Sequence, residues 1–304
     1  MQTALIIGGS GFIGKYLIKL LQNNGYKVRT LSRRKLPDIE SYACDLLTLS
    51  IPKEAFKGVN LVVHLAGYTS DIESSSKVYE KYERLNYYAT KALAEIADNE
   101  SVENFIFFSS VKAGGIPPVN ICASEDDHFP SLGPYGESKR RAEKYLLNFS
   151  VRSRMKINII RPSIVYGPDM KGNLSSMLKL IKKGYFPPLP QTHNVKSMIH
   201  VDDLVELVLF LIKKKYNRQI FIATDGIQYS SNDLYKKMCS SLGKKTRKYH
   251  VPLIFFKLIG LLGKNLSFKI KKIFSSECYS SKKLVREGFK TTRNLSHLNK
   301  SDYR

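Results

Sequence analysis

Tyr135 and Lys139 are the pair of residues best suited to acid–base chemistry in this sequence. They lie four positions apart in the sequence, so on a helix both side chains point to the same side, one turn apart. A tyrosine has an ordinary pKa of ~10, and a nearby ammonium group lowers it by favouring the phenolate. The pair is therefore a candidate for donating and accepting a proton at an alcohol or ketone oxygen.

Ser109 and Ser110 follow a segment, residues 104–108, that we expect to be a buried strand. Ligands of parallel α/β sheets bind at the carboxyl edge, where these serines would lie. A serine hydroxyl there could hold the same substrate oxygen as the tyrosine. The Tyr-x-x-x-Lys pattern alone also fits a solvated helix turn, but its place after a strand ending in Ser-Ser favours catalysis.

A glycine-rich loop with the spacing G-x-x-G-x-x-G follows an expected strand over residues 3–7 and opens an expected helix over residues 12–24. Glycines at these places permit a tight turn, close approach of the backbone to a pyrophosphate, and close packing of helix on strand. The helix N-terminus offers free N–H groups to phosphate. The predicted cofactor contacts of this loop are Gly8, Gly11, Phe12, Ile13 and Gly14.

The residues after the second expected strand, over residues 26–31, should choose between the two nicotinamide cofactors. An acidic residue at this place binds the ribose 2′-hydroxyl of NAD, whereas arginine accommodates the 2′-phosphate of NADP. The sequence reads Ser32-Arg33-Arg34 and has no acidic residue between Gly25 and Pro37. We therefore predict that these three residues contact the cofactor, that NADP(H) is favoured, and that NAD(H) remains an alternative.

Strands and helices alternate through the first half of the chain, which predicts a parallel sheet covered on both faces. From about residue 161 the alternation breaks at prolines and glycines. We predict an α/β fold: a doubly wound parallel sheet of the Rossmann type with a smaller C-terminal substrate domain. The expected division is residues 1–165 and residues 166–304, with some later segments returning to the first domain.

The net charge of +23 is concentrated near the C-terminus. Residues 213–304 hold 22 Lys and Arg against 5 Asp and Glu, leaving 27 against 21 for the rest of the chain. The basic residues form no recognisable nucleic-acid motif, so we expect no nucleic-acid partner. Residues 250–274 are basic and apolar: the favoured interpretation is a helix packed on the substrate domain with its lysines in water, and the alternative is an interfacial helix on an anionic membrane.

The four cysteines are scattered without a C-x-x-C pair, which argues against a disulfide scaffold, a zinc site and a secreted origin. No apolar run approaches the ~20 residues that span a bilayer. We expect a cytoplasmic protein, with contact to the inner face of the membrane left open. The acidic run Glu125–Asp127 is interpreted as a solvated loop, and His64 and His200 as structural.

The chain resembles the extended short-chain dehydrogenases/reductases, and within them the NAD-dependent epimerase/dehydratase family. The resemblance rests on motifs in the expected order over residues 3 to about 225. They are Gly8/Gly11/Gly14, His64-Leu65-Ala66-Gly67, Phe105–Ser110, Tyr135/Lys139, Arg161-Pro162 and Ile199-His200-Val201-Asp202-Asp203.

The resemblance implies a role for each matching residue. Tyr135 would be the acid/base, Lys139 would bind the nicotinamide ribose, and Ser110, or Ser109 one residue away, would polarise the substrate oxygen. Asn86 would lie on the helix behind the site. Further cofactor contacts would be Asp45, Leu46, Leu65, Ala66, Gly67 and Pro162.

The segments after residue 161 resemble those of UDP-hexose 4-epimerases and UDP-sugar 4-ketoreductases of bacterial surface-polysaccharide synthesis. Asn173 and Leu174 would contact the substrate diphosphate, and Lys196 would meet its charge. No Arg-Pro-Gly-Asp stretch follows, although many sugar epimerases carry one. We predict redox chemistry at C4 of a UDP-sugar and leave epimerisation or reduction open. A steroid- or flavonoid-type ketoreductase and a non-catalytic NADP-binding regulator are the alternatives, and a homodimer is a possible assembly.

Overall fold

The computed structural model describes residues 1–69, 76–131, 133–246 and 251–298. Its centre is a seven-stranded sheet in which every pair of neighbours is parallel. From edge to edge the strands are β10 (Gln219–Ala223), β7 (Lys156–Pro162), β5 (Asn104–Phe108), β4 (Leu61–His64), β1 (Thr3–Ile7), β2 (Lys27–Ser32) and β3 (Glu40–Ala43). The order reverses at β1 and β4, so the carboxyl ends of these two strands form the switch point where doubly wound sheets bind ligands. The predicted Rossmann-type α/β fold is confirmed.

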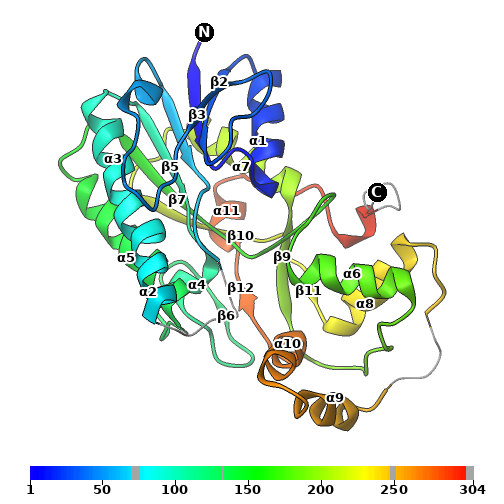
Figure 1. Ribbon diagram of the computed structural model, residues 1–304. Coiled ribbons are helices and arrows are strands. Elements are labelled where there is room, and N and C mark those ends of the chain that lie inside the picture. The colour runs from blue at the N-terminus through cyan, green and yellow to red at the C-terminus, as the bar shows by residue number, and fades with distance from the viewer. Residues whose placement is uncertain (70–75, 132, 247–250, 299–304) are drawn as a thin grey trace.

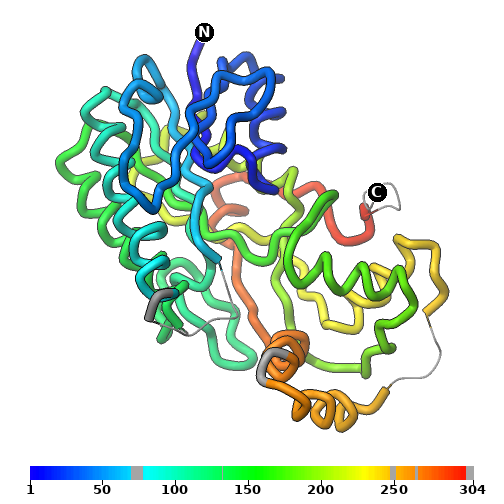
Figure 2. Tube along the Cα trace, viewed as in Figure 1, coloured from blue at the N-terminus to red at the C-terminus, as the bar shows by residue number. Residues whose placement is uncertain are grey.

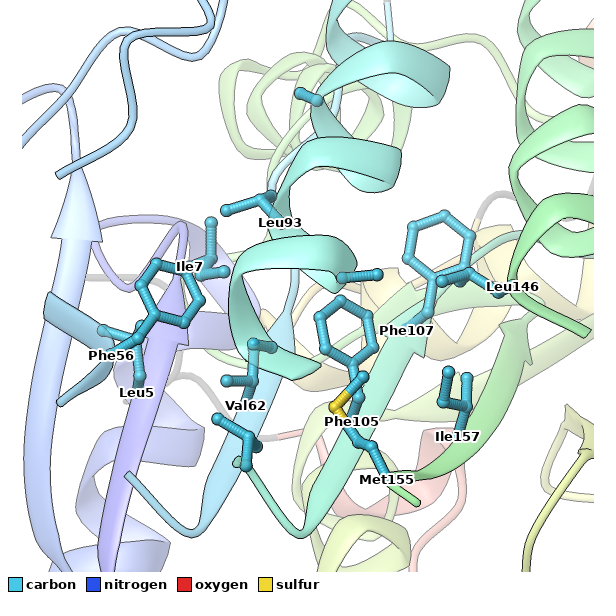
Figure 3. Packing of buried hydrophobic residues seen from close by; sticks show 14 of the residues in the cluster. Leu5, Ile7, Phe56, Val62, Leu93, Phe105, Phe107, Leu146, Met155 and Ile157 are labelled. Atoms are coloured by element: carbon cyan, nitrogen blue, oxygen red, sulfur yellow. The ribbon is translucent and has the colours of Figure 1, made fainter. Parts of the chain in front are cut away.

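Helices cover both faces of this sheet (Figure 1). On one face lie α2 (Ser76–Tyr82), α3 (Ala89–Asn99) and α5 (Pro134–Phe149), and on the other α1 (Phe12–Asn23) and α7 (Val201–Lys214). Phe105 and Phe107 point from β5 into the first layer, between Leu93 and Leu146 of its helices (Figure 3). Burial of these side chains on both faces explains why the strands read as continuous apolar runs.

The helix that was expected to carry Asn86 is interrupted. Between α2 and α3 the chain forms a π-helical turn, η2 (Glu83–Tyr88), which adds a residue to the turn. Asn86 lies in this turn and is fully buried. Hydrophobic periodicity could not show the change, because a π turn keeps the chain helical and only rotates the side chains that follow.

The second part of the molecule holds a small sheet of β8 (Ile164–Tyr166), β9 (Lys196–His200) and β11 (Gln228–Tyr229). A separate apolar cluster joins this sheet to α6 (Asn173–Lys183), α8 (Ser231–Ser241), α9 (Leu253–Gly260) and α10 (Lys264–Phe274). α7 and β10, which come later in the chain than β8, pack with the large sheet instead. The remaining elements are η1 (Lys53–Phe56), α4 (Val111–Gly114), α11 (Lys282–Arg286) and η3 (Leu295–His297).

A disulfide joins Cys122 to Cys278 across 156 residues of sequence. The two cysteines lie on β6 (Cys122–Ala123) and β12 (Cys278–Tyr279), which pair as a two-stranded parallel sheet. The scattered cysteines were expected to form no disulfide scaffold, and this single disulfide corrects that expectation. Spacing along the chain could not reveal the link, because tertiary folding alone brings the two strands together.

No described helix is long and apolar enough to cross a membrane. Within the described part of the chain, no group of three or more His, Cys, Asp or Glu residues has a geometry that could hold a metal ion.

Candidate active site

Two serines connect the end of β5 to the short helix α4. Ser110 is the N-cap of α4, and its hydroxyl oxygen accepts a hydrogen bond from the Lys112 backbone N–H at 3.2 Å. Ser109 is 5% exposed, and its hydroxyl has no hydrogen-bond partner among the residues that the structure describes. An unpaired buried hydroxyl is costly, which suits a group that awaits a ligand. Both predicted serines therefore lie at the carboxyl edge of the sheet.

Tyr135 lies in the first turn of helix α5, next to this edge. The helix begins with Pro134, whose missing N–H suits the first turn. Gly136 allows the turn to approach α4 closely, because a Cβ on this residue would lie 2.6 Å from the Lys112 carbonyl oxygen. Tyr135 and Ser110 are thus brought to neighbouring turns of two packed helices, and the Tyr135 ring lies 6.1 Å from that of Tyr82.

Lys139 is buried one turn below Tyr135. Its ammonium donates a hydrogen bond to the Phe108 carbonyl oxygen at 2.9 Å and lies 4.5 Å from the centre of the Phe107 ring. Burial lowers the pKa of Lys139 to about 7, although the Glu143 carboxylate opposes the shift. The buried ammonium is therefore held at the end of β5, one helical turn from Tyr135.

Asn86 links three parts of the site through its amide group. Its oxygen accepts from the Tyr68 backbone N–H at 2.8 Å, and its nitrogen donates to the Ser138 hydroxyl at 3.0 Å. Ser138 in turn donates to the Tyr135 carbonyl oxygen at 2.9 Å. The π turn η2 therefore fixes the first turn of α5. The role of Ser138 was missed by the sequence analysis, and only its place between Tyr135 and Lys139 could have signalled it.

The glycine loop fits a dinucleotide pyrophosphate. Gly8 has a φ of +90°, and a Cβ on Gly14 would lie 2.5 Å from the Gly9 carbonyl oxygen. Helix α1 begins directly after Gly11, with no side-chain cap and no acidic residue in its first turn. Its first N–H groups and positive dipole end are thus available to phosphate oxygens. Phe12 and Ile13 follow in this turn, and both are half-buried.

The residues after β2 give weak support to a phosphate site. Arg33 and Arg34 are exposed, and their predicted contact with a cofactor phosphate stays a prediction. The hydroxyl of Ser32, however, already donates to the Arg34 carbonyl oxygen at 2.7 Å. Its hydrogen is therefore not available to a 2′-phosphate. Near the same edge Asp45 is exposed, whereas Leu46 is 5% exposed and belongs to the core.

The stretch after β4 lies at the switch point of the sheet. The N–H groups of Leu65 and Ala66 both donate to the Ile7 carbonyl oxygen, at 2.9 and 3.0 Å. A Cβ on Gly67 would lie 3.0 Å from the Asn86 oxygen and 3.1 Å from the Lys139 ammonium. These contacts connect the carboxyl ends of β1 and β4 directly to Lys139.

A buried ion pair joins helix α5 to β7. Arg161 bonds the two carboxylate oxygens of Glu143 at 3.0 and 2.7 Å, and both side chains are at most 3% exposed. The neighbouring Pro162 ends β7 and pairs with Ala223 of β10. Glu125, expected in a solvated loop, is instead buried: its carboxylate accepts from the Ile222 N–H at 2.7 Å, and burial raises its pKa.

Residues 4–223 match the NAD dependent epimerase/dehydratase family. The chain belongs to this family. It is similar to a UDP-glucose 4-epimerase of Vibrio cholerae, with 30% identity over 96% of this chain and 94% of the relative. It is also similar to a decarboxylating sterol-4-alpha-carboxylate 3-dehydrogenase of Dictyostelium discoideum, with 30% identity over 100% and 98%. Among solved structures, MoeE5 in complex with UDP-glucuronic acid and NAD aligns with a TM-score of 0.79 and 24% identity, covering 99% of this chain and 98% of that one.

In this member of the epimerase/dehydratase family, the three residues predicted to contact the substrate, Asn173, Leu174 and Lys196, lie in different surroundings. Asn173 is exposed at the first turn of α6. Leu174 is half-buried against the apolar cluster of the second part of the molecule (the substrate part: β8, β9, β11, α6, α8, α9 and α10). Lys196 is buried, and its ammonium donates to the Lys272 carbonyl oxygen at 2.7 Å and to the Ser275 hydroxyl at 2.9 Å. Lys196 therefore holds the end of α10, and its predicted contact with a substrate diphosphate stays a prediction.

The family motif after β9 fastens the C-terminal segment. His200 caps α7 by accepting from the Asp202 N–H at 3.2 Å, which agrees with its expected structural role. Asp203 is fully buried and accepts from the backbone N–H groups of Thr292 and Arg293. His64 is also buried, with its Nε2 3.0 Å from the Thr90 hydroxyl. Burial and the Lys139 charge hold the pKa of His64 well below its ordinary value.

The free energy of unfolding of this protein without its cofactor is expected to depend on pH because of the protonation of Lys139. The pKa of Lys139 is about 7 in the folded chain against an ordinary 10.5, so the unfolded chain binds one more proton between these values. Stability therefore rises with pH in this window, and the cost of burying the charge is fully present below about pH 7. Lys139→Met removes that cost, so its melting temperature should exceed that of the wild type most at pH 6 and by less at pH 10. Calorimetry at both pH values measures the difference, and a difference independent of pH would contradict the assignment.

Proposed function

We propose that the chain is an NAD(H)-dependent epimerase acting at C4 of a UDP-hexose. The observation that carries the proposal is the junction of α5 with β5, where Tyr135 stands one turn above a buried Lys139 that is bonded to the last carbonyl of the strand. This junction lies beside a glycine loop that fits a pyrophosphate. The similarity to the Vibrio cholerae UDP-glucose 4-epimerase supports the substrate class.

The residues divide the proton chemistry between them. The Tyr135 oxygen takes the proton of the C4 hydroxyl while the C4–H bond breaks and a C4 carbonyl forms. Bound NAD would accept the hydride from C4 and would return it to C4 in the second half of the reaction. Ser110 holds the C4 oxygen, and Lys139 holds the cofactor ribose and favours the phenolate form of Tyr135. After the keto sugar rotates, Tyr135 returns the proton, so the reaction has no net oxidation.

NAD is the cofactor that we propose, which replaces the NADP(H) preference expected from Arg33 and Arg34. The family is NAD dependent, and the solved MoeE5 complex contains NAD. The engaged Ser32 hydroxyl also removes one predicted phosphate donor. Equilibrium dialysis with NADH and NADPH measures the preference, and tighter binding of NADPH would restore the original prediction.

The sterol dehydrogenase relative favours a second candidate, oxidation of a 3-hydroxysteroid. A third outcome of the same active site is reduction of a 4-keto sugar, as in the polysaccharide-precursor reductases that the sequence resembles. All three reactions use Tyr135 and Lys139 alike. They differ in whether the cofactor is consumed and in what the substrate part accepts.

One set of incubations separates the candidates. The purified protein is mixed with UDP-glucose, UDP-GlcNAc, UDP-4-keto-6-deoxy-GlcNAc or a 3-hydroxysteroid, each with NAD⁺, NADH or NADPH, and the products are resolved by chromatography. We expect a UDP-hexose to interconvert with its C4 epimer without net change in cofactor absorbance. NAD(P)H consumed only with the keto sugar would establish a reductase, and NADH formed only with the steroid would establish a dehydrogenase.

A further inference from the structure

Exposed apolar side chains gather on α9, α10 and the turn between them. Nine of the nineteen large hydrophobic side chains that are exposed in the described part of the chain lie between residues 253 and 268. Leu261 and Leu262 in the turn are 81% and 82% exposed. Single exposed hydrophobic residues are ordinary, but a contiguous group of this size marks an interaction site. The nine are Leu253, Ile254, Phe255, Leu258, Ile259, Leu261, Leu262, Leu266 and Phe268.

The same two helices are anchored by their other face. Phe256 is 4% exposed and meets the ring of Phe274 edge to face at 5.2 Å between centroids. Ile270 and Ile273 pack on the apolar cluster of the substrate part. The favoured interpretation of residues 250–274 therefore holds for one face only, and residue 250 lies outside the described residues. In the described part of the chain, the apolar side chains on the outer face are 36–82% exposed.

Positive charge accompanies the exposed apolar group. No acidic residue lies between Asp233 and Glu277, and the side chains of Lys257, Lys269 and Lys271 are exposed on the two helices. An anionic lipid bilayer has negatively charged headgroups at its surface and apolar acyl chains beneath them. Apolar side chains interspersed with lysines complement both layers. A second copy of the chain fits less well, because a symmetric contact would set these lysines against each other.

The α9–α10 hairpin, residues 253–274, lies at one end of the molecule. Figure 1 shows α9 and α10 at the lower end, away from the seven-stranded sheet, and Figure 2 shows the turn between them on the outside of the chain path. Its base is held through Lys196 and Asn194, which donate to carbonyl oxygens of Lys272 and Ile273 at 2.7 and 3.3 Å. A body held in this way can insert its tip without unfolding the substrate part.

We propose that the α9–α10 hairpin, residues 253–274, docks the protein on an anionic membrane surface. Leu261 and Leu262 enter the boundary between headgroups and acyl chains, and the exposed lysines bind the lipid phosphates. The protein then lies on the bilayer without crossing it, with the substrate part nearest the lipid. The proposal rests on the hairpin and does not depend on which reaction the active site performs.

Sedimentation with vesicles tests the proposal on the full-length protein. Wild type is expected to pellet with vesicles containing phosphatidylglycerol, to pellet far less with pure phosphatidylcholine, and to be released as salt is raised from 0.05 to 0.5 M because the lysine attraction is screened. The double variant L261S/L262S should reduce the partition coefficient about tenfold or more. The triple variant with Lys257, Lys269 and Lys271 changed to Gln should do so at low salt.

Matched variants on other surfaces separate a local effect from a general one. V151S/V285S replaces two exposed apolar side chains elsewhere, and a triple Gln variant at Lys19, Lys53 and Lys213 removes the same charge. Both controls should bind vesicles as the wild type does. Failure of the wild type to pellet with phosphatidylglycerol, or equal pelleting by L261S/L262S, would overturn the proposal. A dimer seen by light scattering without lipid and lost in L261S/L262S would assign the hairpin to a second copy instead.

Discussion

Tyr135→Phe is expected to lower kcat for C4 epimerisation by about 10²–10⁴-fold, the usual contribution of a positioned proton-transfer group. The change removes one oxygen atom and leaves the ring, which packs near Tyr82, in place. Binding of the cofactor and of the UDP-sugar should change little, because the substituted hydroxyl acts on the C4 proton. Initial rates and equilibrium dialysis measure the two quantities separately.

Tyr145→Phe is the matched control for this substitution. Tyr145 lies on the same helix, and its hydroxyl donates to the Glu95 carboxylate at 2.8 Å on the surface facing α3. Losing this hydrogen bond should cost about 1 kcal/mol of stability and leave kcat within a factor of two. A Tyr135→Phe enzyme with wild-type kcat would remove Tyr135 from the proposed mechanism.

Arg161→Met is expected to lower the free energy of unfolding by about 3–5 kcal/mol, because it leaves the buried Glu143 carboxylate without its partner. The pair joins β7 to the catalytic helix, and both side chains are at most 3% exposed. Urea denaturation monitored by circular dichroism measures the loss. Since Glu143 stands one turn after Lys139, activity should fall together with the order of α5.

A second variant and a surface pair keep this prediction specific. Glu143→Leu combined with Arg161→Met removes both charges and should recover much of the lost stability, since well-packed apolar residues can replace a buried ion pair. Asp169→Asn removes the exposed partner of Lys15, 4.0 Å away, and should change stability by less than about 1 kcal/mol. A loss for Arg161→Met as small as that for Asp169→Asn would show that the buried pair contributes little.

Local sequence was sufficient for most of the large sheet and its cofactor loop. The strands over residues 3–7 and 104–108 have the predicted bounds, because short apolar runs between turn residues require burial on both faces. The glycine spacing predicted the cradle before α1, since each glycine answers a local steric demand. Tyr135 and Lys139 could be paired because one helical turn relates them.

Contacts between distant segments were beyond the reach of those patterns. Tertiary folding alone brings Cys122 to Cys278, Asn86 to Ser138 and Arg161 to Glu143. The fold also places the end of α10 against the Lys196 ammonium, and the contact of Lys196 with a substrate phosphate stays a prediction.

The basic, apolar segment near the C-terminus shows the same division. Its composition established that it carries positive charge and apolar side chains. Only the tertiary structure decided which face of each helix is buried and which is left to solvent, because burial depends on the partner surface that the rest of the fold provides. Sequence determined the chemistry available at each position, and the packing of distant elements determined which groups meet.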